Sequence, residues 1–331
     1  MRILVTGGAG YIGSVLIGRL LERGYSVVCL DKLFFGDKAV KPYMGMKDFK
    51  LVVEDTRTFN PEILKGVDTV VDLAAISQPD PLGRIRRKLY HEINYKGPLR
   101  VATLSRKHGV RKYIFTSTCS VYGSQEGLLS EVSQPKPLEE YARTKLMAEK
   151  ELKPLSSKQF SVTILRLATV YGLSRKMRFD LVVNGMTLSL YKTGVIKVMR
   201  PGTQVRPVVH VADVVKAITT VIEAEDEEVN GETFNIGSNV QNYQIYQLAK
   251  LIGDSVGKPY RLEWYGEPDT RSYAVDFTKI RSRLGFTVSH TPTDGAREVY
   301  RALEDGEISD TPETRVIQWW RRLQDQGSIR W

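Results

Sequence analysis

The sequence predicts an α/β protein: a doubly wound parallel sheet with a smaller, interleaved α/β substrate-binding domain built on it. Two observations predict the sheet. Short apolar strands alternate with helical stretches over the first half of the chain, and the first strand passes directly into three glycines spaced three apart. The expected strands are Ile3–Thr6, Val27–Asp31, Phe49–Val53, Thr69–Leu73, Tyr113–Ser117 and Val162–Leu167. This order favours parallel pairing through right-handed crossovers.

Helical spacing fills the gaps between these strands. The expected helices are about Ile12–Arg23, Asn94–His108, Leu138–Leu152 and Ala212–Ala224. The alternation weakens after about Leu167, but Glu232–Ile236 again has the composition of a strand. We therefore expect one domain at residues 1–168 plus about 211–237, and a second at about 169–210 plus 238–331.

The composition is that of an ordinary globular protein with an excess of positive charge. Of 331 residues, 42% are hydrophobic and 26% charged, and the net charge is +10. No apolar stretch approaches the ~20 residues that span a bilayer, and no signal-peptide pattern opens the chain, so we expect a cytoplasmic protein without a membrane partner. Two cysteines and four isolated histidines give no metal-binding spacing. Basic clusters such as Arg84–Lys88 lack interleaved aromatic residues, which argues for solvated helix faces rather than a nucleic-acid partner.

The run Thr6-Gly7-Gly8-Ala9-Gly10-Tyr11-Ile12-Gly13 predicts a dinucleotide-binding turn of the Rossmann type. Gly7 allows the sharp turn out of the strand, Gly10 lets backbone N–H groups approach a pyrophosphate, and Gly13 allows the next helix to pack on the sheet. That helix points its positive end at the phosphates. Asp31, about twenty residues on, suits the ribose hydroxyls of NAD and repels a 2′-phosphate, although Lys32 beside it leaves NADP open.

Tyr141 and Lys145 stand one helical turn apart, which places the phenol and the ammonium on one face. A nearby ammonium favours phenolate and lowers the pKa of a tyrosine, so this pair is suited to carry a proton. Several hydroxyl side chains between Phe115 and Gly123 follow a strand at the carboxyl edge of the sheet, where such sheets bind ligands. One of these hydroxyls should bridge a substrate hydroxyl and Tyr141.

With these motifs in place, the chain resembles the extended short-chain dehydrogenases/reductases of the NAD-dependent nucleotide-sugar epimerase/dehydratase family, whose prototype is UDP-glucose 4-epimerase. Further matching motifs are Glu54-Asp55-Thr56-Arg57, Asp72-Leu73-Ala74-Ala75, Ile93-Asn94, Val121-Tyr122-Gly123 and Arg206–Asp213, so the resemblance covers nearly the whole chain. It implies that Thr118 takes the catalytic Ser/Thr place, Tyr141 that of the acid/base and Lys145 that of its partner. It also implies NAD as cofactor, and a homodimer formed by pairing helices such as Asn94–His108 and Leu138–Leu152.

The residue patterns and the resemblance together give the expected ligand contacts. The cofactor-binding residues are Gly7, Gly10, Tyr11, Ile12, Gly13, Asp31, Lys32, Asp55, Thr56, Leu73, Ala74, Ala75, Asn94, Ser117, Tyr141 and Lys145. The substrate-binding residues are Ser77, Thr118, Cys119, Ser120, Thr169, Arg178, Asn184, Arg206 and Arg271. Arg206 and Arg271 would hold a diphosphate, which the planar guanidinium fork fits. His210 and Asp213 are expected to hold a turn and cap a helix rather than perform chemistry.

Two departures from the family pattern bear on the reaction. Thr169 stands where the family commonly has an asparagine that contacts substrate, and Cys119-Ser120 stands where dehydratases carry an Asp-Glu pair, which disfavours a 4,6-dehydratase. The leading hypothesis is an NAD-dependent epimerase that acts at C4 of a UDP-hexose, such as UDP-glucose/UDP-galactose or an N-acetyl analogue, through a transient 4-keto sugar. The alternatives are a net 4-dehydrogenase or reductase, for example on a GDP-sugar, and a non-catalytic NAD-binding regulator or scaffold. The aromatic and basic C-terminal segment 316–331 is expected to dock on the body of the protein.

Overall fold

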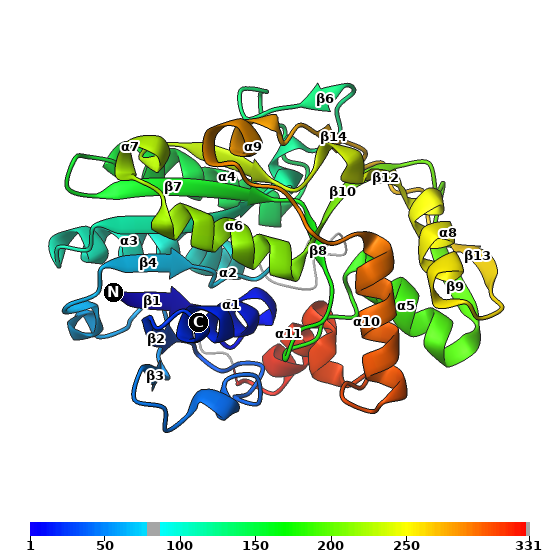
Figure 1. Cartoon of the computed structure of the whole chain (residues 1–331), viewed down its shortest axis with the longest axis horizontal. Coiled ribbons are helices and arrows are strands. Elements are labelled where there is room, and N and C mark those ends of the chain that lie inside the picture. Colours follow the sequence, from blue (N-terminus) through cyan, green and yellow to red (C-terminus); the bar gives the residue numbers. More distant parts are fainter. Residues whose placement is uncertain (78–86, 329–331) are drawn as a thin grey trace.

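A seven-stranded parallel sheet forms the centre of the protein (Figure 1). The structure, a computed structural model, describes residues 1–77 and 87–328. The strand order is β11-β7-β5-β4-β1-β2-β3, and every neighbouring pair is parallel. The strands are β1 (Arg2–Thr6), β2 (Ser26–Leu30), β3 (Phe49–Val52), β4 (Thr69–Asp72), β5 (Lys112–Thr118), β7 (Ser161–Leu167) and β11 (Thr233–Ile236). The predicted doubly wound parallel sheet is confirmed.

Helices cover both faces of this sheet. They include α1 (Tyr11–Glu22), α2 (Arg87–His91), α3 (Gly97–Lys107), α4 (Glu140–Leu152), α6 (Val211–Glu223) and α7 (Asp226–Val229). Side chains alternate between the two faces of a strand, so Ile3 and Val5 of β1 enter the core shared with α1 and α6, whereas Leu4 enters the core shared with α3 and α4. Because both faces are buried, these strands read as continuous apolar runs in the sequence.

The remaining strands, all but β6 from the chain after β7, belong to a smaller unit beside the carboxyl edge of the sheet. Its strands are β6 (Leu128–Leu129), β8 (Thr169–Tyr171), β9 (Val195–Met199), β10 (Val205–His210), β12 (Asn242–Gln244), β13 (Arg261–Tyr265) and β14 (Ala274–Val275). Its helices are α5 (Val182–Thr193), α8 (Ile245–Val256), α9 (Thr278–Leu284) and α10 (Pro292–Glu304). Figure 1 shows α5, α8 and α10 gathered at one end of the molecule. The chain returns to the large sheet through α6 and β11; the domain boundaries given above remain a prediction.

One predicted helix has a different form. The stretch expected as a helix from Asn94 contains a π-helical turn, Glu92–Lys96, before α3 begins at Gly97. Asn94 is fully buried there: its side-chain oxygen accepts from the Ile76 N–H at 2.8 Å, and its amide donates to the Ile76 carbonyl at 3.1 Å. A wider turn of this kind often lies near functional sites. Here it lets one amide satisfy both backbone groups of a residue just beyond β4.

The C-terminal helix α11 (Val316–Asp325) docks on the body of the protein, as expected. The Trp320 ring lies 5.0 Å from that of Phe34 and 6.1 Å from that of Phe35, and the Trp319 indole N–H donates to the Phe34 carbonyl at 2.6 Å. Residues 329–331 of the aromatic tail, and residues 84–86 of the basic cluster, lie outside the described residues. Within residues 1–77 and 87–328, no helix combines the length and the apolar character needed to cross a membrane.

Candidate active site

The glycine-rich turn between β1 and α1 has the shape that a dinucleotide requires. Gly7 has φ +64°, and a Cβ at this position would lie 2.9 Å from the backbone of Ala74. A Cβ at Gly13 would lie 2.5 Å from the Gly7 carbonyl oxygen, so only glycine lets α1 start so close to the strand. The turn therefore fits a bound diphosphate, with the α1 N-terminus directed at the site.

Asp31 follows β2 directly, beside this turn. One carboxylate oxygen accepts from the Ala9 N–H at 3.0 Å and the other from the Leu33 N–H at 2.8 Å. Burial raises the pKa of Asp31, and these two hydrogen bonds act against that rise. The carboxylate is thus held in a fixed orientation at the carboxyl end of β2, one strand from the point between β1 and β4 where the strand order reverses and where such sheets bind ligands.

One cavity of about 1090 Å³ joins this turn to the smaller unit. Most of the expected site residues line it: Gly7, Gly10, Tyr11, Ile12, Gly13, Asp31, Lys32, Asp55, Thr56, Leu73, Ala74, Ala75, Ser77, Ser117, Thr118, Ser120, Tyr141, Lys145, Thr169, Arg178, Arg206 and Arg271. Residues from the β1–α1 turn, the end of β5, helix α4 and the second half of the chain therefore face one space. A cavity of this size suits a ligand larger than a single nucleotide.

Three of the expected residues do not line this cavity, and their side chains have partners inside the protein. Cys119 is fully buried and its thiol donates to the Arg166 carbonyl at 3.2 Å, and burial raises the pKa of the thiol, which disfavours a thiolate nucleophile. Asn94 is occupied by Ile76, as described above. Asn184 is fully buried on α5; its oxygen accepts from the Gly172 N–H at 2.9 Å and its amide donates to the Tyr11 hydroxyl at 3.1 Å.

Thr118 and Tyr141 meet at the carboxyl end of β5. The Thr118 hydroxyl oxygen accepts from the Ser120 N–H at 3.1 Å, which leaves its proton free to donate. The pKa of Tyr141 is not lowered in this state of the site. Burial raises the pKa of Tyr141 to about 12, while the hydrogen bond with Thr118 and the charge of Arg178 oppose the rise. Tyr141 is therefore a neutral phenol at pH 7 until further positive charge enters the cavity.

Lys145 is 2% exposed on α4, with its ammonium 4.2 Å from the centre of the Phe115 ring. Burial lowers the pKa of Lys145 to about 8, against the opposing charges of Asp72 and Glu149. Asp72 is itself buried, and accepts from the hydroxyls of Thr6, at 2.6 Å, and Tyr113. The cavity thus contains a desolvated ammonium, the kind of group that proton-transfer sites use.

Three arginines from the segments between β8 and β14 line the cavity, and Arg315, just before α11, lines it as well. Arg206 and Arg271 share Asp269, with nitrogen–oxygen distances of 2.9 and 2.8 Å. Arg271 also pairs with Glu139 at 3.0 Å. The two guanidinium groups of Arg206 and Arg271 thus face two carboxylates, Asp269 and Glu139. Arg178 pairs with Asp180 at 2.7 Å and donates to the Ser77 hydroxyl at 2.9 Å. It also lies close enough to Tyr141 to lower the pKa of that residue.

Comparison with known proteins decides which family has this arrangement. The model of the NAD dependent epimerase/dehydratase family matches residues 3–237. The chain belongs to this family. A Bacillus subtilis protein described as an uncharacterized UDP-glucose epimerase is 31% identical over 89% of this chain and 95% of its own length.

Solved structures agree with this membership. MoeE5 in complex with UDP-glucuronic acid and NAD superposes with a TM-score of 0.82, 27% identity and coverage of 92% of this chain and 100% of that one. UDP-glucuronic acid 4-epimerase from Bacillus cereus, also with UDP-glucuronic acid and NAD, gives a TM-score of 0.82, 26% identity and coverage of 92% and 99%. As a member of the epimerase/dehydratase family, the protein is an enzyme that uses NAD.

In this family NAD supplies a hydride acceptor, and the Gly7–Gly13 turn and Asp31 are the residues that would hold its adenosine diphosphate half. Asp31→Ala removes both carboxylate oxygens and is expected to weaken NAD binding about ten- to hundredfold, the range of a hydrogen bond to a charged group. Calorimetric titration with NAD measures this effect. Asp48→Ala, at an exposed site before β3 and at the opposite end of the strands, is the control and should bind NAD like the parent; equal affinities for both variants would remove Asp31 from the site.

A buried ion pair supports the catalytic residues from behind. Glu149 of α4 and Arg166 of β7 are 6% and 7% exposed and approach to 2.7 Å, and Glu149 also accepts from the Ser117 hydroxyl. Arg166 donates to the Tyr122 hydroxyl at 3.0 Å. The pair ties the helix that carries Tyr141 and Lys145 to the central strands.

Arg166→Met is expected to lower the free energy of unfolding by about 3–5 kcal/mol, because it leaves the Glu149 carboxylate buried without a partner. Urea unfolding at pH 7 gives this value. Arg143→Met provides a matched control, since Arg143 pairs with Glu140 on the exposed side of the same helix at 3.7 Å and should contribute less than about 1 kcal/mol. Equal losses in the two variants would show that Glu149 does not depend on Arg166.

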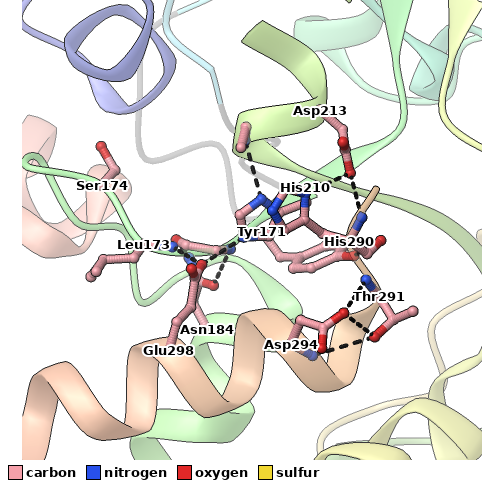
Figure 2. Close-up of polar contacts among 12 residues, drawn as sticks. Tyr171, Leu173, Ser174, Asn184, His210, Asp213, His290, Thr291, Asp294 and Glu298 are labelled. Carbon is pink, nitrogen blue, oxygen red and sulfur yellow. Dashed lines mark hydrogen bonds and ion pairs between the residues drawn. The ribbon is translucent and has the colours of Figure 1, made fainter. Parts of the chain in front are cut away.

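His210 caps the helix that follows it, as the sequence predicts, whereas Asp213 joins distant segments instead of holding a local turn (Figure 2). The His210 ring nitrogen Nδ1 accepts from the Ala212 N–H at 3.2 Å and so caps α6. Asp213 accepts from the backbone N–H groups of Ser289 and His290 at 2.9 and 3.0 Å. These contacts join α6 to the segment that leads into α10.

Sequence reasoning missed some of the cavity lining. Phe34 and Phe35 after Asp31, Lys176 after β8 and Trp320 of α11 all line the cavity. For Lys176 the only sequence signal is its place in the segment Leu173–Asn184, which follows the family's Val-Tyr-Gly motif. Trp320 offers no motif, since an aromatic tail docked on a protein can lie on any surface.

Proposed function

We propose that the protein is an NAD-dependent 4-epimerase of a UDP-hexose. The observation that carries this proposal is that Thr118, Tyr141 and Lys145 line the same cavity as the NAD-binding turn and as Arg206 and Arg271. A proton carrier, a hydride acceptor and a diphosphate holder are the three parts that oxidation at a sugar carbon requires. The similarity to proteins described as a UDP-glucose epimerase and a UDP-glucuronic acid 4-epimerase supports UDP as the nucleotide and C4 as the reacting carbon.

In the proposed reaction, Tyr141 as phenolate takes the proton from the C4 hydroxyl while the hydrogen on C4 leaves as hydride to NAD. The Thr118 hydroxyl donates to the sugar oxygen and orients it toward Tyr141. A 4-keto sugar results and remains bound by its diphosphate, which Arg206 and Arg271 hold. When the keto sugar rotates within the site and presents its other face, the hydride returns to the opposite face of C4 and Tyr141 returns the proton. The configuration at C4 then inverts without net use of NAD.

The departure of this chain from the dehydratase pattern, Cys119-Ser120 in place of an Asp-Glu pair, also supports an epimerase rather than a dehydratase. Removal of water across C5 and C6 needs an acid and a base beside the catalytic threonine, and Cys119 and Ser120 supply neither a carboxylate nor an accessible thiol. Net dehydrogenation at C4 would use the same residues, so the fate of the cofactor separates these two reactions.

Proton NMR of the purified protein with UDP-glucose, UDP-N-acetylglucosamine or UDP-glucuronic acid and catalytic NAD tests the proposal. We expect anomeric signals of the corresponding galacto epimer at constant absorbance at 340 nm. Stoichiometric NADH with a 4-keto product would establish a dehydrogenase instead. Unchanged spectra with all three UDP-sugars, and with GDP- and dTDP-sugars, would reject the proposal in favour of a non-catalytic NAD-binding protein.

A homodimer and a cytoplasmic location are part of this proposal. Helices α3 and α4 lie beside each other on one face of the sheet and are the surfaces expected to pair. Light scattering should then give twice the chain mass of 37.4 kDa; a single chain mass at micromolar concentration would reject the dimer.

A further inference from the structure

A buried lysine outside the predicted site lines the cavity without a partner of opposite charge. Lys176 follows β8 and is only 9% exposed. Within residues 1–77 and 87–328, its ammonium has no hydrogen bond or ion pair; it lies 3.9 Å from the centre of the Phe35 ring. Burying a cation without an anion is costly, so this position calls for a negative ligand.

The segment that carries Lys176 is fastened to the NAD-binding turn. The Ser174 hydroxyl donates to the Tyr11 carbonyl at 2.7 Å and lies 3.1 Å from the Ser14 hydroxyl, both in the first turn of α1. The Lys176 N–H donates back to the Ser174 hydroxyl at 3.3 Å. These contacts place Lys176 next to the helix end that is directed at the cofactor diphosphate.

Two further contacts fix the start of the same segment (Figure 2). Glu298 of α10 accepts from the Leu173 N–H at 2.6 Å, and Asn184 of α5 accepts from the Gly172 N–H at 2.9 Å. The segment is thus held by α1, α5 and α10 before any ligand binds. A cation on a preorganised segment binds with less loss of conformational entropy than one on a free loop.

The carboxylates near Lys176 do not offset the cost of burying its ammonium. Burial lowers the pKa of Lys176 to about 7, and Arg178 adds to this effect. Asp31, Asp180 and Glu313 oppose it without restoring the usual value. Asp180 is already paired with Arg178, so it is not a free partner for Lys176.

We propose that Lys176 is a cofactor-binding residue whose ammonium contacts the diphosphate of NAD beside the N-terminus of α1. The Phe35 ring holds the ammonium in place through its face. Since this proposal concerns the cofactor alone, it stands whichever sugar nucleotide the enzyme uses. The segment after β8 would then reach two parts of the site: Lys176 would contact the cofactor diphosphate, and Arg178, two residues on, lies close to Tyr141.

Calorimetric titration of the full chain, freed of bound nucleotide, with adenosine, ADP-ribose and NAD tests the proposal. Lys176→Met is expected to weaken ADP-ribose and NAD about ten- to hundredfold and to leave the affinity for adenosine, which has no phosphate, within twofold of the parent. Removing a buried unpaired cation should not lower the unfolding midpoint.

Arg175→Met is the matched control: it removes one positive charge from the next residue, which is exposed and does not line the cavity. It should bind all three ligands like the parent. Equal losses for adenosine and ADP-ribose in Lys176→Met, equal losses in both variants, or no loss at all would each overturn the proposal. If Lys176→Met does not fold, Lys176→Gln serves in its place with the same expected pattern.

Discussion

Tyr141→Phe is expected to lower kcat about 10²- to 10⁴-fold, the range of a positioned general acid or base. The substitution removes one hydroxyl and keeps the ring that packs beside α11 and α2. NAD affinity and the unfolding midpoint should therefore stay close to those of the parent. The rate of epimer formation by NMR, with the sugar nucleotide that the parent converts, measures the effect.

The size of this effect has a physical reason in the pKa of Tyr141. In the described site that pKa is about 12, so a phenolate at neutral pH depends on positive charge from Lys145, Arg178 and a cationic ligand such as the oxidised nicotinamide. Tyr191→Phe, an exposed tyrosine on α5, controls for the loss of a phenol elsewhere. If Tyr141→Phe kept more than a tenth of the parental turnover, Tyr141 would not be the acid/base.

Lys145→Met is expected to lower kcat at least 100-fold and, at the same time, to stabilise the nucleotide-free protein at pH 7. The ammonium is buried and its pKa is lowered to about 8, below the value near 10.4 that it has in the unfolded chain. A linear apolar side chain of similar length removes that desolvation cost. The gain should be on the order of 1–3 kcal/mol.

The pH dependence of this gain has a definite sign. Below pH 8 Lys145 is charged in both the folded and the unfolded protein. The full cost of burying the ammonium then lowers the free energy of unfolding of the parent. Between about pH 8 and 10.4 the unfolded chain binds more protons, so parental stability rises with pH and the advantage of Lys145→Met shrinks. Urea unfolding of both proteins at pH 7 and 9.5 measures this difference. A variant that is less stable than the parent at pH 7 would show that the ammonium is compensated in the folded protein.

The sequence could predict the sheet and the NAD-binding turn because local spacing determines them. The three glycines of the β1–α1 turn are required by close backbone approaches, and Asp31 follows from the position of β2. Tyr141 and Lys145 share a face because helical periodicity puts them there. These features are visible as spacings in the sequence, even where the close approach itself is to a distant residue, as Gly7 is to Ala74.

Features that depend on burial or on distant segments could not be predicted in this way. The pKa of Tyr141 rises because elements far apart in sequence enclose it, which no four-residue spacing reveals. Cys119 begins a 3-10 turn that directs its thiol to β7 instead of the cavity. Lys176 reaches the NAD-binding turn only through Ser174, whose partners lie about 160 residues earlier.

The central claim is that hydride leaves and returns to the same sugar carbon, and deuterium at C4 tests it most directly. UDP-glucose labelled with deuterium at C4, or the correspondingly labelled UDP-sugar that the enzyme converts, is incubated with enzyme and catalytic NAD in ordinary water and followed by NMR. We expect both epimers to keep deuterium at C4, with no proton taken up from solvent. Loss of the label to water during epimerisation would contradict it, because the hydrogen would then leave as a proton and not as a hydride.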